Sequence, residues 1–285
     1  MKRKLIQLGK STLVVSIPQK WAKEQELNPG SELDLEIKEN ALLLTKEAEI
    51  IEKKIEINAH QNTNTTKRII ATLYRQGFTE ITIKNPNENN IKEIYNITEK
   101  RLIGFEVVTH KDKKCILRQL GKIDSYDFDN ALRRLFLLIL DLANETVEVL
   151  EKKQKQESAK FIEDNINKFS TYCERLLIIF RNKLKKSYDY YYLVKQLENL
   201  GDHYYYLTKE TFKKNPINEL KDANENLREL YELFYNFNFE KMDELYTKLR
   251  KEAKDAKKSN KNQPILEIKL RIDELISPVV AINIE

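Results

Sequence analysis

The sequence predicts a multidomain α+β protein in which a small β domain and a small α/β layer precede a helical domain. Only six Gly and six Pro occur in 285 residues, and Leu, Ile, Lys and Glu are frequent, which favours helices over a turn-rich all-β fold. Apolar residues alternate in short runs near the N-terminus and recur at helical spacing from residue 123 onward. The predicted domains are residues 1–48, 49–121 and 122–285.

Residues 1–48 are predicted to form two β-hairpins and one short helix. The first hairpin turns at Gly9-Lys10, and Pro18 is placed to open the helix, because a proline in the first turn removes no helical hydrogen bond. The helix is expected to end before the turn sequence Asn28-Pro29-Gly30. The predicted strands are 5–8, 12–17, 33–38 and 41–45, and the predicted helix is 19–26. Four strands and one short helix cannot bury a sufficient core in so short a segment, so we expect a homodimer.

Residues 49–121 alternate between strand and helix patterns, which predicts a small α/β layer. Gly77 is expected to close the first helix, and residues 110–113 are expected to connect the last two strands as a hairpin. The predicted strands are 54–58, 80–84, 105–109 and 114–119, and the predicted helices are 65–76 and 89–99. The segment contains no Gly-rich phosphate loop and no nucleophile motif, so we assign it a spacer or dimer-shaping role.

The remainder of the chain shows helical period throughout. The apolar stripes define six helices, which cover 132–146, 162–180, 193–207, 220–234, 239–253 and 265–279. They fall into two runs of three, separated near Asn215-Pro216, which predicts a duplicated three-helix bundle. Pro278 is expected to kink or end the last helix.

The charge of the chain is unevenly distributed. Residues 1–23 contain six Lys and Arg and no acidic residue, whereas the other 262 residues sum to a net charge of −1. A basic segment of this kind is typical of a protein that binds a polyanion, since Lys and Arg neutralise phosphates and release counterions. Gln7, Ser11 and Thr12 add hydrogen-bonding groups in the same hairpin. The alternative is a basic surface that serves solubility alone.

A family resemblance supports the DNA-binding interpretation. The segment KRKLIQLGKSTLVVSIPQKWAK, residues 2–23, followed by LNPG at 27–30, resembles the AbrB/SpoVT/MazE swapped-hairpin family. The resemblance covers residues 1 to 48 and implies that two chains interleave their hairpins and present paired basic surfaces to double-stranded DNA. The positions that it carries over are Arg3, Lys4, Lys10, Ser11, Thr12 and Lys20.

The helical domain contains an acidic motif, Glu198-Asn199-Leu200-Gly201-Asp202-His203. Glu198 and Asp202 are four residues apart, so on a helix they share a face and can chelate a cation. The small Gly201 leaves room either for a metal or for the close approach of another helix. The alternative for the pair is a solvated acidic face, and Asp141 and Glu145 form a second pair of the same spacing.

The motif and the three-helix repeats resemble PhoU, the phosphate-uptake regulator. The likeness covers 121 to 285, and together with the N-terminal segment it is similar to archaeal-type chains that join an AbrB-like head to a PhoU-like tail. It implies a divalent or iron-type metal ion bound on the bundle. The sequence departs from the family in two places. Asn167 stands where a carboxylate is expected, and Asp273-Glu274 lacks the acidic spacing of a second site.

The remaining residues exclude several classes of protein. Cys115 and Cys173 have no metal-ligand spacing, and no His, Cys or Ser lies in a catalytic arrangement, so we expect a cytoplasmic protein that is not an enzyme. The longest apolar run of the helical domain, 135–140, is too short to cross a membrane. The basic N-terminal segment and the two family resemblances together imply a transcriptional regulator of phosphate uptake or homeostasis. The alternative is an adaptor that binds a phosphate ABC transporter or a sensor kinase without physiological DNA binding, and a metal-dependent enzyme is the third candidate.

Overall fold

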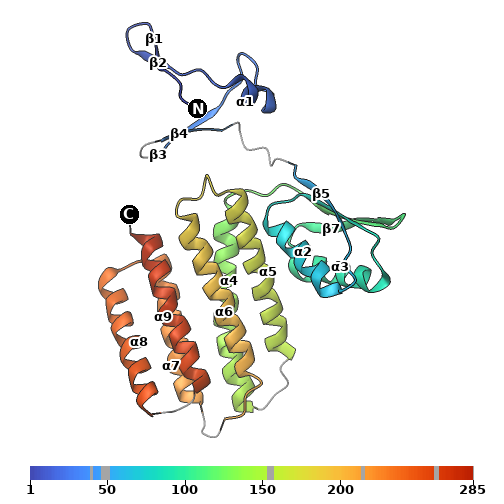
Figure 1. The fold of residues 1–285 in the computed structure, drawn as a ribbon. Helices are drawn as coiled ribbons and strands as arrows, with labels where there is room; N and C mark the ends of the chain where they lie inside the picture. Colours follow the sequence, from blue (N-terminus) through green and yellow to red (C-terminus); the bar gives the residue numbers. More distant parts are fainter. Residues whose placement is uncertain (39–40, 46–51, 153–156, 213–215, 260–262, 285) are drawn as a thin grey trace. The chain divides into compact units, whose positions relative to one another are not determined.

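The structure, a computed structural model of the whole chain, describes residues 1–38, 41–45, 52–152, 157–212, 216–259 and 263–284. The chain divides into two compact units, Met1–Ile51 and Glu52–Glu285, which we call the head and the body. The head contains β1 (Ile6–Leu8), β2 (Thr12–Val14), α1 (Gln19–Glu24), β3 (Asp34–Lys38) and β4 (Ala41–Thr45), drawn in blue in Figure 1.

The head consists of two separate antiparallel hairpins and the helix α1. β1 pairs with β2 through a turn in which Gly9 has a φ of +71°, a conformation that glycine adopts without steric cost. Pro18 has an extended conformation and is the N-cap residue of α1, one position before the predicted helix start. Both hairpins and the helix were predicted, although β2 ends at Val14 and α1 ends at Glu24, earlier than expected. The predicted turn at 39–40 lies outside the described residues.

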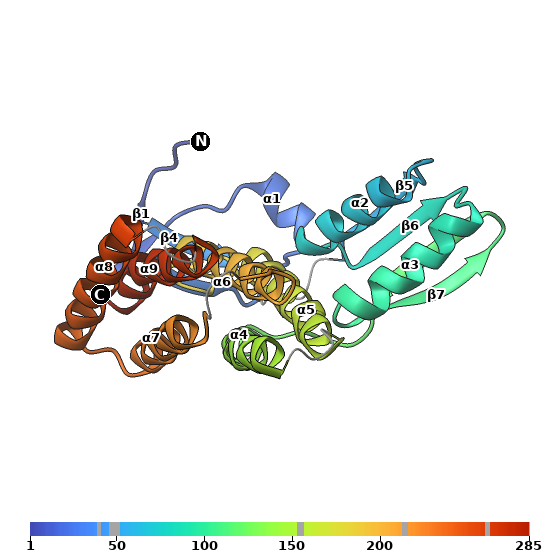
Figure 2. The ribbon, with the colours of Figure 1, turned by 90° about the horizontal axis from the view of Figure 1, so that it is seen from below.

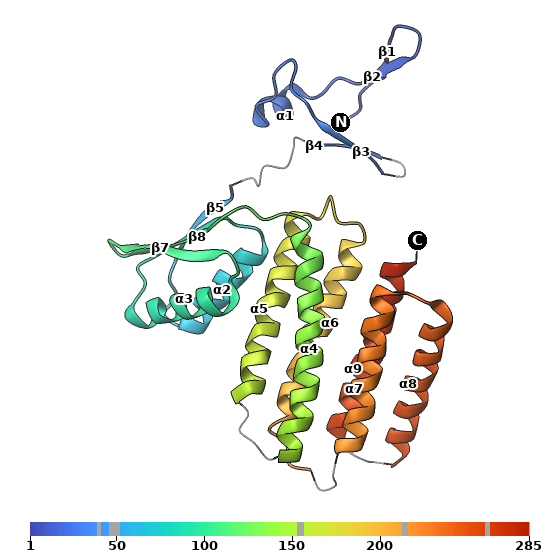
Figure 3. The ribbon, with the colours of Figure 1, turned by 180° about the vertical axis from the view of Figure 1, so that it is seen from behind.

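The body begins with a four-stranded sheet and two helices. Its elements are β5 (Lys54–Asn58), α2 (Thr63–Arg75), β6 (Glu80–Lys84), α3 (Glu88–Arg101), β7 (Phe105–Lys111) and β8 (Lys114–Gln119). The strand order is β5-β6-β8-β7, with β5 and β6 parallel and the other pairs antiparallel. Helices α2 and α3 cover one face of this sheet (Figures 1 and 3). The predicted four-residue connection between β7 and β8 is shorter in the structure, where Asp112 and Lys113 form the turn with positive φ angles.

Six helices follow within the described residues 127–283. They are α4 (Asp127–Lys152), α5 (Glu157–Ile179), α6 (Ser187–Leu207), α7 (Ile217–Tyr235), α8 (Phe239–Ser259) and α9 (Gln263–Asn283). Helices α4, α5 and α6 all pack against one another, and so do α7, α8 and α9. The two sets meet where α4 contacts α7 and α6 contacts α9. The view along the helices in Figure 2 shows this arrangement, with α5 and α8 at opposite ends.

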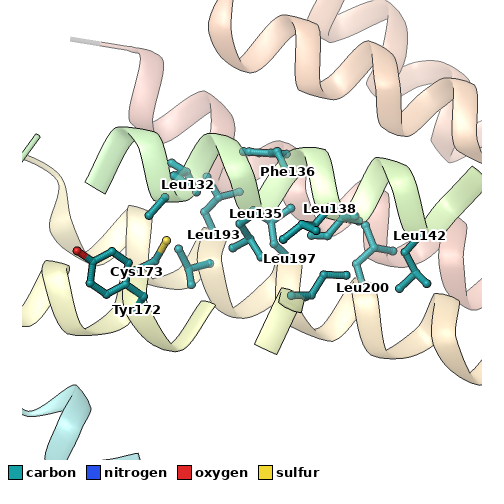
Figure 4. Close-up of a cluster of buried hydrophobic side chains, with 14 of the residues drawn as sticks. Leu132, Leu135, Phe136, Leu138, Leu142, Tyr172, Cys173, Leu193, Leu197 and Leu200 are labelled. Carbon is teal, nitrogen blue, oxygen red and sulfur yellow. The ribbon is translucent and has the colours of Figure 1, made fainter. Parts of the chain in front are cut away.

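The core of the helical part is formed by leucines on facing helices. Leu132 and Leu135 of α4 meet Leu193 and Leu197 of α6, and Cys173 of α5 lies beside them (Figure 4). These five side chains are 1% exposed or less. Both cysteines are free and buried, and burial raises the pKa of the Cys115 thiol to about 11 and that of Cys173 still further. Neither thiol is therefore a nucleophile at neutral pH.

Pro278 was predicted to kink or end the last helix, and the helix does not end there. Helix α9 continues through the buried Pro278 to Asn283. A proline removes one helical hydrogen bond, but Leu275, three residues earlier, and Val279, the next residue, are fully buried against the bundle. Tertiary packing thus keeps the helix intact. None of the described helices is long and apolar enough to cross a membrane.

A buried arginine joins the α/β layer to α5. Arg175 is 1% exposed, its Nη2 donates to the side-chain Oε1 of Gln119 at 2.6 Å, and its Nη1 donates to the backbone oxygen of Tyr74. The guanidinium also lies 4.6 Å from the ring centroid of Tyr74 and 5.0 Å from that of Phe105. Burial lowers the pKa of Arg175 to about 10, so the group stays charged at neutral pH. This charge is stabilised by oxygens and aromatic faces from three different elements of the layer.

Candidate nucleic-acid interface

The basic side chains of the head are all exposed. Three precede β1, one lies in the β1–β2 turn and two lie on α1; they are Lys2, Arg3, Lys4, Lys10, Lys20 and Lys23. Among the described residues, only Lys20 of these six forms an ion pair, at 4.0 Å from Glu24 with both side chains exposed. An exposed pair at that distance adds little stability, so all six cations are available to a ligand.

The predicted polar groups lie in the same hairpin as Lys10. Gln7 is the central residue of β1 and pairs with Leu13, while Thr12 begins β2 opposite Leu8. Ser11 lies in the turn beside Lys10, and all of these polar side chains are exposed. The structure thus places Gln7, Lys10, Ser11 and Thr12 in one hairpin, with Gln7 and Thr12 on opposite faces. It places Arg3 and Lys4 on the segment that enters β1, and Lys20 on α1. Ammonium groups beside hydroxyl and amide donors are the chemistry that binds phosphodiester oxygens.

The head has no core of its own within the described residues. None of the described residues among 1–45 is buried. In the β3–β4 hairpin the register places Leu35, Ile37, Leu42 and Leu44 on one face, and the first three are 57%, 76% and 62% exposed. An isolated two-stranded hairpin is marginally stable, and a monomer rarely exposes so continuous an apolar face. The head therefore requires a partner surface to cover these side chains.

The comparisons with known proteins concern this same segment. Residues 6–52 match the family model described as "Antidote-toxin recognition MazE, bacterial antitoxin". The match supports a domain of the swapped-hairpin, DNA-binding type at the N-terminus, similar to the one that the sequence resembles. The searches of curated proteins and of solved structures returned no match.

The acidic motif of the body lies on α6, as predicted, but the carboxylate of Glu198 pairs with a lysine of the chain itself. Glu198 accepts a hydrogen bond from Lys195 on the same helix, and Lys195 Nζ is also 3.5 Å from the buried Glu174 of α5. Burial raises the pKa of Asp202, and the negative charges of Glu163 and Glu198 raise it further. His203 is half-buried, and its Nδ1 lies 2.7 Å from the backbone oxygen of Asn199.

Two buried glutamates on α5 were missed by the sequence analysis. Glu163 is 7% exposed and accepts hydrogen bonds from Lys160 and Asn167, so the asparagine supports this carboxylate. Glu174 is 2% exposed, accepts a hydrogen bond from Tyr191, and has a pKa raised by its burial. Both positions continue the apolar stripe of the helix at helical spacing, and that spacing was the signal that could have placed them inside.

These contacts bear on the metal implied by the PhoU resemblance. Among the described residues, no three His, Cys, Asp or Glu side chains are arranged to hold a metal ion. The carboxylates of Glu163 and Glu198 form ion pairs with the ammonium groups of Lys160 and Lys195. The small side of α6 at Gly201 faces Ile166 of α5, whose Cγ2 lies 3.0 Å from the position that a Cβ would take. Gly201 was predicted to leave room either for a metal or for the close approach of another helix, and the geometry supports the close approach of α5. The residues present fit a metal poorly.

Proposed function

We propose that the chain is a DNA-binding transcriptional regulator that acts as a homodimer through its head. The observation that carries the proposal is the head itself, in which exposed basic side chains accompany an apolar hairpin whose Leu35, Ile37 and Leu42 no described residue of the head buries. Two heads that cover each other's apolar residues place two basic hairpins on one particle. A dimer of this kind recognises duplex DNA through phosphate contacts, and base contacts by Gln7, Ser11 and Thr12 add sequence preference.

The body supplies the second part of the proposal, a sensor or interaction domain that links DNA binding to phosphate uptake or homeostasis. The support for this part is the PhoU resemblance together with six helices in two sets of three. We propose that the state of this domain biases the geometry of the paired heads, so no bond chemistry is required and the protein is not an enzyme. A metal at Glu198 and Asp202 stays a prediction from the resemblance, and its binding would have to displace Lys195 from Glu198.

The decisive experiment measures duplex DNA binding by the full chain as a function of salt. Reversal of three head charges, K4E/K10E/K20E, is expected to abolish binding, because three lysines that neutralise phosphates become carboxylates that repel them. In the parent protein, each phosphate contact is expected to contribute about 0.9 to the slope of log affinity against log salt. The matched control is K241E/K248E/K251E on α8, where three exposed lysines of the body are reversed. Unchanged affinity in the head variant would contradict the proposal.

A second measurement separates the regulator from the adaptor. Genome-wide mapping of bound DNA at high and low phosphate is expected to show enrichment at transporter promoters. Stable capture of a phosphate transporter or sensor kinase, with no DNA retained at moderate salt, would favour the adaptor instead.

A further inference from the structure

The β5-β6-β8-β7 sheet has an outer face, opposite the side that α2 and α3 cover. This face carries two rows of charged residues, one with alternating signs and one with three lysines. In β8, Cys115 and Leu117 are buried toward the helices, whereas Lys114 and Arg118 point to the exposed face. The strand pairing aligns residues of all four strands into rows across that face. The two rows differ in whether their charges stabilise the sheet.

The first row alternates in sign. Reading across β5, β6, β8 and β7, its members are Lys54, Glu80, Arg118 and Glu106. Arg118 Nε donates to Glu80 Oε2 at 2.8 Å, and Nη2 lies 2.6 Å from the same oxygen. Opposite charges on neighbouring strands stabilise a sheet, so this row is explained by the structure alone.

The second row, at the end of the sheet near the β7–β8 turn, has three lysines side by side. Reading across the same strands, its members are Asn58, Lys84, Lys114 and Lys111. Lys113 of the adjoining turn is also exposed. We call Lys84, Lys111 and Lys114 the lysine row. Like charges directly opposite each other destabilise a sheet.

The neighbouring acidic side chains only partly neutralise the lysine row. Glu56 pairs with Lys84 and lies 3.6 Å from Lys114, so one carboxylate serves two ammonium groups. Among the described residues, no ion pair of Lys111 is present, and its side chain is exposed. The side chains of Lys84 and Lys114 are 41% and 48% exposed despite their pairing with Glu56. The row therefore presents a net positive charge to solvent.

The charge balance of the whole chain points to the same segment. Residues 52–121 contain thirteen Lys and Arg against eight Asp and Glu, a net charge of +5. Residues 1–51 contain eight of each sign, so the head as a whole is neutral although its first 23 residues are strongly basic. The net charge of +5 on the whole chain therefore equals that of the α/β layer. The N-terminal segment is thus not the only basic part of the protein.

We infer that the lysine row is a second contact for duplex DNA, which binds the phosphodiester backbone without reading sequence. Neighbouring strands are about 4.8 Å apart, so the three ammonium groups span a distance over which several backbone phosphates follow one another. The negative phosphates of DNA reduce the repulsion among the three lysines of the row. This charge complementarity is the reason for choosing duplex DNA as the ligand. The inference rests on the proposed function of the head and deepens it, because one chain then holds DNA through two units and gains avidity.

The test uses the full chain and a fluorescently labelled duplex that spans several helical turns, with anisotropy measured between about 50 and 200 mM salt. The variant K84Q/K111Q/K114Q is expected to bind more weakly, with a salt slope lower by up to about 2.7, which is about 0.9 for each phosphate that the variant no longer neutralises. The same variant is expected to be about as stable to heat as the parent protein, because the removal of like-charge opposition offsets the loss of the exposed Glu56 pairs.

The control K241Q/K248Q/K251Q on α8 removes the same net charge from the body and is expected to leave the slope unchanged. If the lysine-row variant and this control behave alike while the parent protein binds DNA, the inference is overturned and the proposed function of the head stands. If the parent protein shows no salt-dependent DNA binding, the proposed function fails, and the inference fails with it.

Discussion

Gly201 lies buried on α6 within the acidic motif, and its replacement by alanine distinguishes close helix packing from an open ligand site. A Cβ at this position would lie 3.0 Å from Cγ2 and 3.1 Å from Cδ1 of Ile166 on α5. Ile166 is 1% exposed and β-branched, so its side chain has little freedom to move away. Alanine in place of glycine contributes about 1 kcal/mol of helix propensity. Overpacking costs about 1 to 3 kcal/mol, so we expect a net destabilisation of up to about 2 kcal/mol.

The assay is urea unfolding followed by far-UV circular dichroism, because the single tryptophan, Trp21, lies in the head and does not report on α6. The double variant G201A/I166V removes one of the two crowded carbons. Its loss of stability is expected to be smaller than the sum of the two single losses by about 1 kcal/mol. The control N199A, at an exposed site on the same helix, is expected to be neutral or slightly stabilising. A stabilisation of about 1 kcal/mol by G201A, or strict additivity in the double variant, would refute the close approach.

Three further predictions concern the dimer, the joint with α5 and a buried carboxyl. The change I37D puts a charge on the apolar face of the β3–β4 hairpin and is expected to shift the protein to monomer in sedimentation, with a change in Trp21 emission. R175A is expected to destabilise the body by about 3 kcal/mol in urea unfolding, because it leaves a cavity and an unpaired Gln119 oxygen, whereas the similarly sized R175M costs about 1 kcal/mol. Burial raises the pKa of Glu174 above its ordinary 4.5, so the folded protein binds a proton at Glu174 more tightly than the unfolded chain does. The stability of the wild type therefore falls as pH rises from 4.5 through the raised pKa. E174Q lacks this dependence, and its stability relative to wild type is expected to increase between about pH 4 and about pH 7 in parallel urea titrations.

Each of these predictions has an outcome that contradicts it. A dimer that persists in I37D would show that another surface joins the two chains. Equal losses in R175A and R175M would show that the hydrogen bonds and not the packed volume determine the stability of the joint. A stability difference between wild type and E174Q that stays constant with pH would show that Glu174 keeps its ordinary pKa in the folded protein.

The sequence predicted the elements of the α/β layer well because their signals are local. The structure has β5, β6 and β8 at the predicted residues, since each is a short run with clear alternation between turn signals. The β7–β8 turn was predicted too long, because Asp112 and Lys113 adopt positive φ angles without a glycine to mark them. Local rules predicted a kink or an end of the last helix at Pro278; the helix does not end there, because the burial of Leu275 and Val279 outweighs one missing hydrogen bond.

The sequence by itself determined where the charges lie along the chain and which segments are strands or helices, because charge and periodicity are properties of the order of residues. Only the tertiary structure decided which charges meet. Glu174 of α5 became a buried partner of Lys195 of α6 through the packing of the two helices. Lys84 and Lys114 are 30 positions apart, and only the order β5-β6-β8-β7 places them side by side. The physical reason is that strand pairing and helix packing join residues whose separation in sequence carries no local signal.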